Sequence, residues 1–151
     1  MLPSEPKIFH GRGSELSDIL KLLMQEAPRI AILGGGGMGK TSLARAVLHH
    51  PTIIGKYAQH RFFVACDSTS SKDELVTLIG AHLGLKPTKY LTKGILHHFT
   101  TNLSCLLVLD NLETLSESTA IRRDIEEFLS LLTDVKHLAL IVSADILTSV
   151  L

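Results

Sequence analysis

Apolar residues along the chain fall into short unbroken runs and into stripes at helical spacing. The runs have the length of strands, and several are rich in aromatic or β-branched residues, so they predict four strands at 29–34, 60–66, 104–110 and 137–144. Stripes that recur every three or four residues predict helices between these strands. The helices are expected to run from Ser14 to Pro28, from Gly39 or Lys40 to just before Pro51, from Ser71 through Leu83, over 90–102, and from Ile121 through Leu132.

Strands that alternate with helices indicate a parallel sheet with helices on both faces. The run at 104–110 is almost entirely apolar, which is typical of a strand covered on both faces. Residues 1–13 contain prolines at positions 3 and 6 and are expected to form an extended arm, so the folded domain is assigned to 14–151. Ligands of parallel sheets bind at the carboxyl ends of the strands, and the segment after the first strand lies at such an end.

That segment, Gly34 to Thr41, matches the phosphate-binding P-loop pattern G-x-x-x-x-G-K-[ST]. A loop that wraps a phosphate points consecutive backbone N–H groups inward, and side chains would obstruct the close approach. The following helix adds unpaired N-terminal amides and the positive end of its dipole. The alternative is a flexible glycine turn with a solvated lysine, which the strand before the motif and the helix after it disfavour. The residues expected to contact a nucleotide here are Gly34, Gly35, Gly36, Gly37, Met38, Gly39, Lys40, Thr41 and Ser42.

A nucleotide at such a loop is bound together with Mg²⁺, and two residues are expected to hold the metal. Thr41 offers its hydroxyl to Mg²⁺, while Lys40 supplies a positive charge to the β and γ phosphates. Asp110 follows four apolar residues at the end of a predicted strand, where P-loop proteins carry a metal-binding carboxylate. The alternative for Asp110 is a turn-forming Asp-Asn pair, and the P-loop upstream favours the metal role.

Hydrolysis also requires a residue that orients or deprotonates the attacking water. Many ATPases of this kind carry a second acid directly after the metal aspartate, but here that position is Asn111, which cannot act as a base. Glu113 is the nearest candidate for the catalytic role, and a solvated loop acid is an equal alternative. We therefore expect at most a slow ATPase.

Composition and charge limit the class of partner. The 151 residues correspond to one domain, and 15 basic residues balance 15 acidic ones, so no direct nucleic-acid binding and no membrane binding are expected. Cys66 and Cys105 each lie in an apolar run and are expected to be buried free thiols, which favours a reducing compartment. The N-terminus lacks the apolar core of a signal peptide and no apolar run reaches transmembrane length, so we expect a soluble cytoplasmic protein.

Three segments together resemble the nucleotide-binding domain of STAND-class P-loop ATPases, the NB-ARC and NACHT-like group of fungal-type multidomain signalling proteins. They are FHGRxxEL at 9–16, GGGGMGKTSLA at 34–44 and LLVLDNLET at 106–114. The similarity extends from residue 8 to about residue 143. The resemblance implies that Phe9 and His10 pack near the adenine and that Arg12 lies near the nucleotide.

The resemblance also implies a P-loop NTPase three-layer sandwich of the additional-strand type. The fourth strand of such a sheet inserts between the P-loop and metal strands, which gives the order 60–66, 104–110, 137–144, 29–34. At the end of the inserted strand, Ser143 is expected to contact the nucleotide, but no arginine follows it to sense the γ-phosphate. Members of the class continue into a fifth strand, a helical domain and a winged-helix domain, so the chain is expected to be incomplete at its C-terminal end.

These features favour the nucleotide-binding part of a signalling switch, which binds ATP or ADP with Mg²⁺ and hydrolyses slowly or not at all. A second hypothesis is a small P-loop kinase, which would need several arginines over the phosphates. A third is a degenerate interaction domain without catalysis. The resemblance leaves self-association through the nucleotide-binding domain open.

Overall fold

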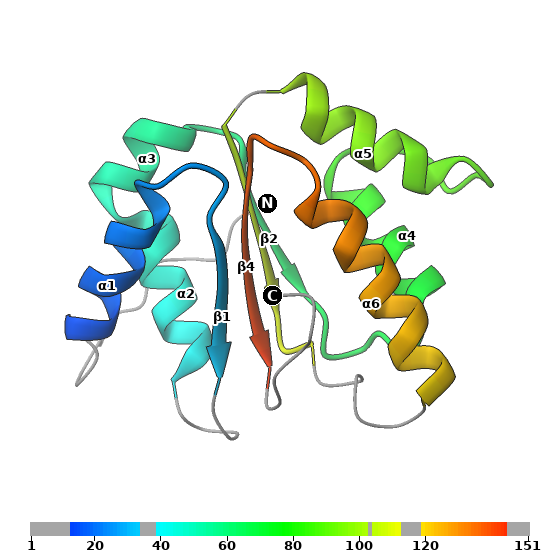
Figure 1. Ribbon diagram of the computed structural model, residues 1–151, viewed down its shortest axis with the longest axis horizontal. Helices are drawn as coiled ribbons and strands as arrows, with labels where there is room; N and C mark the ends of the chain where they lie inside the picture. Colours follow the sequence, from blue (N-terminus) through cyan, green and yellow to red (C-terminus); the bar gives the residue numbers. More distant parts are fainter. Residues whose placement is uncertain (1–12, 34–38, 103, 113–118, 145–151) are drawn as a thin grey trace.

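The computed structural model describes residues 13–33, 39–102, 104–112 and 119–144. At their centre lies a parallel sheet of four strands with helices packed on both faces (Figure 1). The strands are β1 (Arg29–Leu33), β2 (Arg61–Ala65), β3 (Cys105–Asp110) and β4 (Leu138–Ala144), and they lie side by side in the order β1-β4-β3-β2. The predicted three-layer α/β architecture is confirmed, and so is the insertion of the fourth strand between the P-loop strand and the metal strand.

Three helices cover each face of the sheet (Figure 1). On one face lie α1 (Gly13–Leu23), α2 (Lys40–His49) and α3 (Pro51–Tyr57), and on the other lie α4 (Lys72–His82), α5 (Leu91–Thr101) and α6 (Thr119–Thr133). Five of these helices were predicted, and four of them lie within two residues of their predicted bounds. The first one ends earlier than expected, at Leu23, because the chain then turns and Ala27, directly before Pro28, has a positive φ of 48°.

Helix α3 was not predicted. It begins at Pro51, which the sequence pattern treats as the stop of the preceding helix. Proline also suits the first turn of a new helix, because the N–H that it lacks would have no intrahelical partner there. His50 separates the two helices and caps the second, since its ring Nδ1 accepts a hydrogen bond from the backbone N–H of Thr52 at 3.2 Å.

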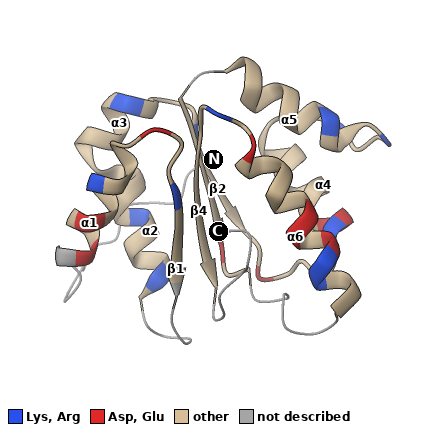
Figure 2. Cartoon of the chain, viewed as in Figure 1, with Lys and Arg blue, Asp and Glu red and all other residues tan. Residues whose placement is uncertain are grey.

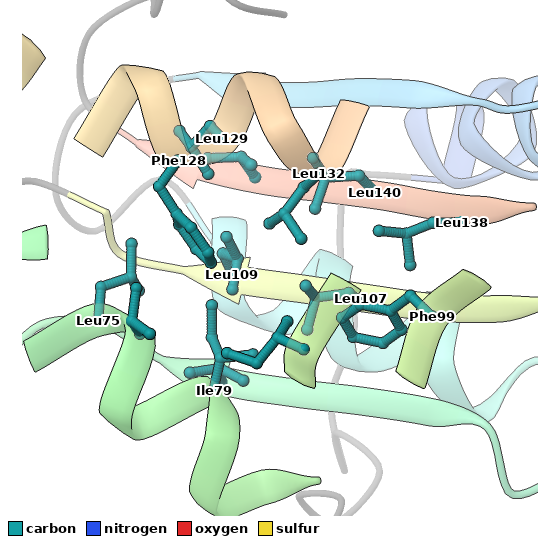
Figure 3. Close-up of a cluster of buried hydrophobic side chains, with 14 of the residues drawn as sticks. Leu75, Ile79, Phe99, Leu107, Leu109, Phe128, Leu129, Leu132, Leu138 and Leu140 are labelled. Carbon is teal, nitrogen blue, oxygen red and sulfur yellow. The ribbon is translucent and has the colours of Figure 1, made fainter. Parts of the chain in front are cut away.

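Alternate residues of the central strands face opposite layers of helices. In β3, Cys105, Leu107 and Leu109 pack with α4, α5 and α6, whereas Leu106 and Val108 pack with α1, α2 and α3. Every residue of β3 is buried, as predicted for a strand covered on both faces, and every residue of β4 is buried as well. Figure 3 shows the first of these two cores, in which side chains of three helices meet the sheet: Leu75, Ile79, Phe99, Phe128, Leu129 and Leu132.

Arginine side chains fasten the amino ends of two strands to the backbone around them. Arg29, at the start of β1, donates to the carbonyls of Thr133 at 2.8 Å and Val135 at 2.9 Å, and also to that of Leu138. Its half-buried position lowers the pKa of the Arg29 guanidinium through desolvation. Arg61, at the start of β2, donates to the carbonyls that close α2 and α3. Both arginines therefore stabilise the end of the sheet that lies opposite the carboxyl ends of the strands.

Charged residues of both signs lie on the outer helices, as Figure 2 shows for α1 and α6. None of the helices in the described ranges combines the length and the apolar character needed to cross a membrane. Cys66 and Cys105 are buried free thiols, as predicted. Burial raises the pKa of Cys105 to about 11, and burial with the nearby charges of Asp110 and Asp67 raises that of Cys66 to about 12.

Candidate phosphate and metal site

The candidate site begins where the P-loop motif enters α2. Gly39 precedes the helix in a left-handed conformation, with φ 76° and ψ 20°, and its carbonyl accepts the first helical hydrogen bond from Leu43 at 3.0 Å. A residue with a Cβ adopts this conformation only at a cost, so the motif glycine has a local structural reason. Gly39 also offers no side-chain acceptor to the first amides of α2, which leaves the helix start suited to an anion.

The motif residues that follow Gly39 lie at this helix start. Lys40 is buried, with 5% of its surface exposed, and Thr41 and Ser42 are half-buried. The Thr41 hydroxyl donates to the Asp110 carboxylate, with 2.8 Å between Oγ1 and Oδ2. This bond joins the P-loop helix to the end of β3 across 69 residues of sequence. The structure thus brings together the two residues that were predicted to hold the metal.

A second hydroxyl holds the other oxygen of the same carboxylate. Ser143, the next-to-last residue of β4, donates through Oγ to Oδ1 of Asp110 at 2.5 Å. The backbone N–H of Asn111 donates to Ser143 Oγ at 2.9 Å, and the N–H of Leu112 donates to the Ser143 carbonyl at 2.9 Å. Ser143 has no exposed surface and Asp110 is 3% exposed. Each oxygen of the Asp110 carboxylate therefore accepts a hydrogen bond from a hydroxyl of the protein itself.

The pairing of the strands explains why these three side chains meet. Leu109 of β3 pairs with Val142 of β4, so the residues that follow each of them, Asp110 and Ser143, are neighbours. Side chains alternate between the two faces of a strand. Asp110 therefore shares the face of Val108, and Ser143 that of Ile141, which is the face covered by α2. Thr41 lies on α2, so all three side chains point to one place at the carboxyl edge of the sheet.

The donor set at this place consists of oxygen atoms. One carboxylate and one hydroxyl, completed by phosphate oxygens and water, is the type of environment that Mg²⁺ prefers. The other predicted site residues lie outside the described ranges: Phe9, His10, Arg12, Gly34, Gly35, Gly36, Gly37, Met38 and Glu113. Of the predicted N-terminal arm, 1–13, the described part is Gly13, which opens α1.

Sequence reasoning missed the backbone turn that directs Asn111 to Ser143. Asn111 has a φ of 58°, in the left-handed region that asparagine tolerates better than most residues with a side chain. This turn aims its N–H at Ser143 Oγ. A turn-forming Asp-Asn pair was considered from the sequence only as the alternative to a metal role of Asp110, and Asn111 was interpreted as the position of a missing acid.

The sequence of the chain matches a known family along nearly its whole length. The family model described as Novel STAND NTPase 1 covers residues 2–150. The chain belongs to this family. This STAND NTPase chain is therefore a nucleotide-binding NTPase domain, and the predicted membership of the STAND class is confirmed.

One curated relative shows a local similarity. It is RGA4, described as a disease resistance protein of Solanum bulbocastanum, and it is 30% identical to this STAND NTPase over 83 residues. The matched segment covers 51% of the chain and 8% of that relative. The chain thus spans a small part of the length of this relative.

Several solved structures have the same fold. Cdc6p from Pyrobaculum aerophilum has a TM-score of 0.72 at 18% identity, and the match covers 95% of this chain and 41% of that one. The Aeropyrum pernix Orc1 protein, solved in complex with DNA, has a TM-score of 0.72 at 16% identity over 94% and 41% of the two chains. Drosophila ORC bound to DNA has a TM-score of 0.58 at 16% identity, with 90% and 77% covered. At these identities the likeness shows the fold alone.

These structures correct the expectation that the chain does not bind nucleic acid directly. That expectation was drawn from the balanced charge, and as an exclusion it is wrong, because two of the proteins that share the fold were solved with DNA bound. Net charge sums over the whole surface, whereas DNA contacts a local part of it. A balanced sum therefore excludes no nucleic-acid partner for this fold.

Proposed function

We propose that the chain binds ATP or ADP with Mg²⁺ at the P-loop and acts as the nucleotide-binding part of a signalling switch. The observation that supports this most directly is the hydrogen bond between Thr41 and Asp110, which unites the P-loop helix with the end of the metal strand. Gly34 to Ser42 would cradle the phosphates through backbone amides, with Lys40 as the point charge. Phe9, His10 and Arg12 are proposed to contact the rest of the nucleotide, on the strength of the family resemblance.

Thr41 and Asp110 are the proposed residues for Mg²⁺. The Thr41 proton is directed at the carboxylate, so the lone pairs of its oxygen remain for a cation. When bound, Mg²⁺ would neutralise part of the charge of the phosphates. The chain's own residues supply its position: α2 holds the hydroxyl and β3 holds the carboxylate at the same edge of the sheet.

We propose that turnover is slow or absent. Asn111 occupies the position next to the metal carboxylate, and its side chain cannot accept a proton as a base. Its backbone forms a turn in which its N–H donates to Ser143 Oγ. Glu113 remains the proposed catalytic residue for any residual hydrolysis. A domain that binds tightly and hydrolyses slowly suits a two-state element that the bound nucleotide biases.

Three arginines of the described residues, Arg29, Arg61 and Arg122, give no support to the kinase hypothesis. A kinase would direct several of them at the transferred phosphate. Arg29 and Arg61 instead donate to backbone carbonyls at the amino ends of the strands, opposite the phosphate site. Arg122 pairs with Glu126 one turn along the exposed face of α6, at 3.2 Å.

Calorimetric titration of ADP and of ATP, each with Mg²⁺, tests the proposal. The wild-type chain should bind at least one of them with micromolar or tighter affinity. Lys40→Ala should weaken that binding by on the order of a hundredfold, because several charged hydrogen bonds to phosphate are lost. Lys72→Ala is the matched control, since Lys72 is likewise the first residue of a helix, α4, but lies on the surface beside Asp73. A folded wild-type chain that binds neither nucleotide would contradict the proposal.

A further inference from the structure

We propose that Ser143 is a positioning residue for the metal carboxylate, whose hydroxyl holds Asp110 in place for Mg²⁺ and does not contact the γ-phosphate. This inference rests on the proposed function. It concerns a residue for which the family resemblance implies a different role, a contact to the nucleotide itself. The two roles compete for the same hydroxyl, and the hydrogen bonds of the structure favour one of them.

The contacts of the Ser143 hydroxyl determine which atom its proton is directed at. A serine hydroxyl carries a single proton and two lone pairs. A backbone N–H can only donate, so the contact from Asn111 at 2.9 Å uses a lone pair of Ser143 Oγ. The proton is then directed at Oδ1 of Asp110, 2.5 Å away. A bond from Ser143 to a phosphate oxygen would need this same proton and would release the carboxylate.

Burial supports the same assignment. Ser143 has no exposed surface, and it lies between β1 and β3, with Ile32 as its paired residue on β1. A side chain in this position is surrounded by the sheet and by the residues of α2 that pack on it. Its hydroxyl would cost free energy if it lacked a partner. Asp110 and the Asn111 amide supply partners within the protein, so the serine is satisfied without a nucleotide.

Two hydroxyls together fix the orientation of the carboxylate. Thr41 donates to Oδ2 and Ser143 donates to Oδ1, so rotation of the Asp110 carboxyl group would break both bonds. Ligands whose rotamers are fixed by surrounding hydrogen bonds bind metals more tightly than free ones, because less order has to be created on binding. Ser143 therefore acts on Mg²⁺ through Asp110, and its loss should weaken the contribution of the metal to nucleotide binding.

The test separates the metal from the nucleotide. ADP and ATP are titrated by calorimetry into the wild-type chain, Ser143→Ala and Val142→Ala, once with Mg²⁺ and once with EDTA in its place. Val142 is the adjacent, equally buried residue of β4, and its side chain packs in the other core. Val142→Ala thus reports how much a general weakening of β4 contributes, without touching Asp110.

We expect Mg²⁺ to strengthen the binding of both nucleotides to the wild-type chain and to Val142→Ala. In Ser143→Ala this gain should fall by about tenfold for ADP and ATP alike, the size of one lost hydrogen bond to a charged group, with affinities in EDTA within about twofold of wild type. Ser143→Thr, which retains a hydroxyl, should keep the gain. Circular dichroism shows whether each variant is folded. If Ser143→Ala does not fold, Ser143→Cys replaces it, because its thiol occupies the place of the hydroxyl and is only a weak donor.

Four outcomes overturn the inference. A gain from Mg²⁺ that is unchanged in Ser143→Ala shows that the hydroxyl does not serve the metal. A loss confined to ATP, present also in EDTA, shows a contact with the γ-phosphate. A wild-type chain that binds nucleotide equally with and without Mg²⁺ removes the metal role but leaves nucleotide binding intact. Binding of neither nucleotide to the wild-type chain overturns the proposed function as well, so the two failures are distinguishable.

Discussion

At the scale of single residues, two side chains of opposite charge form hydrogen bonds at the two ends of the strands. Asp110 accepts hydrogen bonds from Thr41 and Ser143 at the carboxyl edge. Arg29 donates to backbone carbonyls at the amino edge. Asp110 is buried and Arg29 is half-buried, so loss of either side chain would leave hydrogen-bonding partners unsatisfied, which costs more than a hydrogen bond contributes on average.

Replacement of Arg29 by Met should destabilise the fold without affecting the nucleotide site. Met keeps much of the apolar stem but leaves the carbonyls of Thr133, Val135 and Leu138 without their donor. The free energy of unfolding, measured in urea, should fall by about 2–4 kcal/mol. Arg122→Met is the control, because its exposed pair with Glu126 contributes only about 0.3–0.5 kcal/mol. Equal losses in the two variants would contradict the prediction.

The sequence identified the residues of the site, but it did not predict the hydrogen bonds that connect them. Thr41 and Asp110 follow from the motif and from the apolar run before the aspartate. The bond between Asp110 and Ser143 depends on the register of two strands that are 33 residues apart, and hydrophobic patterning does not determine register between parallel strands that are buried on both faces. Asn111 adds a turn that the sequence indicated only as an alternative for the Asp-Asn pair, without its contact to Ser143.

At the scale of elements, local hydrogen bonds explain both ends of α4. Ser71, where the helix was predicted to begin, caps α4, since its Oγ accepts a hydrogen bond from the Glu74 amide at 3.2 Å. The end of α4 is built by Gly84, which has a φ of 74°. The Gly84 amide donates to the Ala81 carbonyl at 3.1 Å and the Leu85 amide to the Gly80 carbonyl at 2.8 Å, which is the Schellman pattern.

Two glycine substitutions should therefore change stability in opposite directions. Gly84→Ala forces a Cβ into the left-handed region and should lower the free energy of unfolding by about 1–2 kcal/mol. Gly55→Ala, inside α3 and with open space around its Cβ, should raise it by up to about 1 kcal/mol. Thermal and urea unfolding followed by circular dichroism measure both. Shifts of the same sign would show that backbone conformation does not decide these two positions.

At the scale of the whole molecule, the order of elements was sufficient to predict the layers. Strands that alternate with helices have few stable arrangements other than a parallel sheet covered on both faces. The order of strands within the sheet came from the family resemblance and not from the pattern itself. Charge was the least informative property at this scale, because a sum of zero gives no information about where the charges lie.

The pairing of the strands should also determine which parts of the molecule unfold locally most easily. Strands β3 and β4 each pair on both sides and are wholly buried, whereas within the described residues β1 pairs with β4 and β2 with β3. Amide hydrogen exchange should therefore be slowest in β3 and β4, at the rate of global unfolding, and faster in β1 and α3 through local opening. MgADP at about a hundred times its Kd should slow the β3 and β4 amides by about a hundredfold, since a ligand of the folded state adds about 2.7 kcal/mol. Lys40→Ala should show the same order of exchange without this gain. Protection in β1 equal to that in β4 would mean that the sheet opens as one unit, against the prediction.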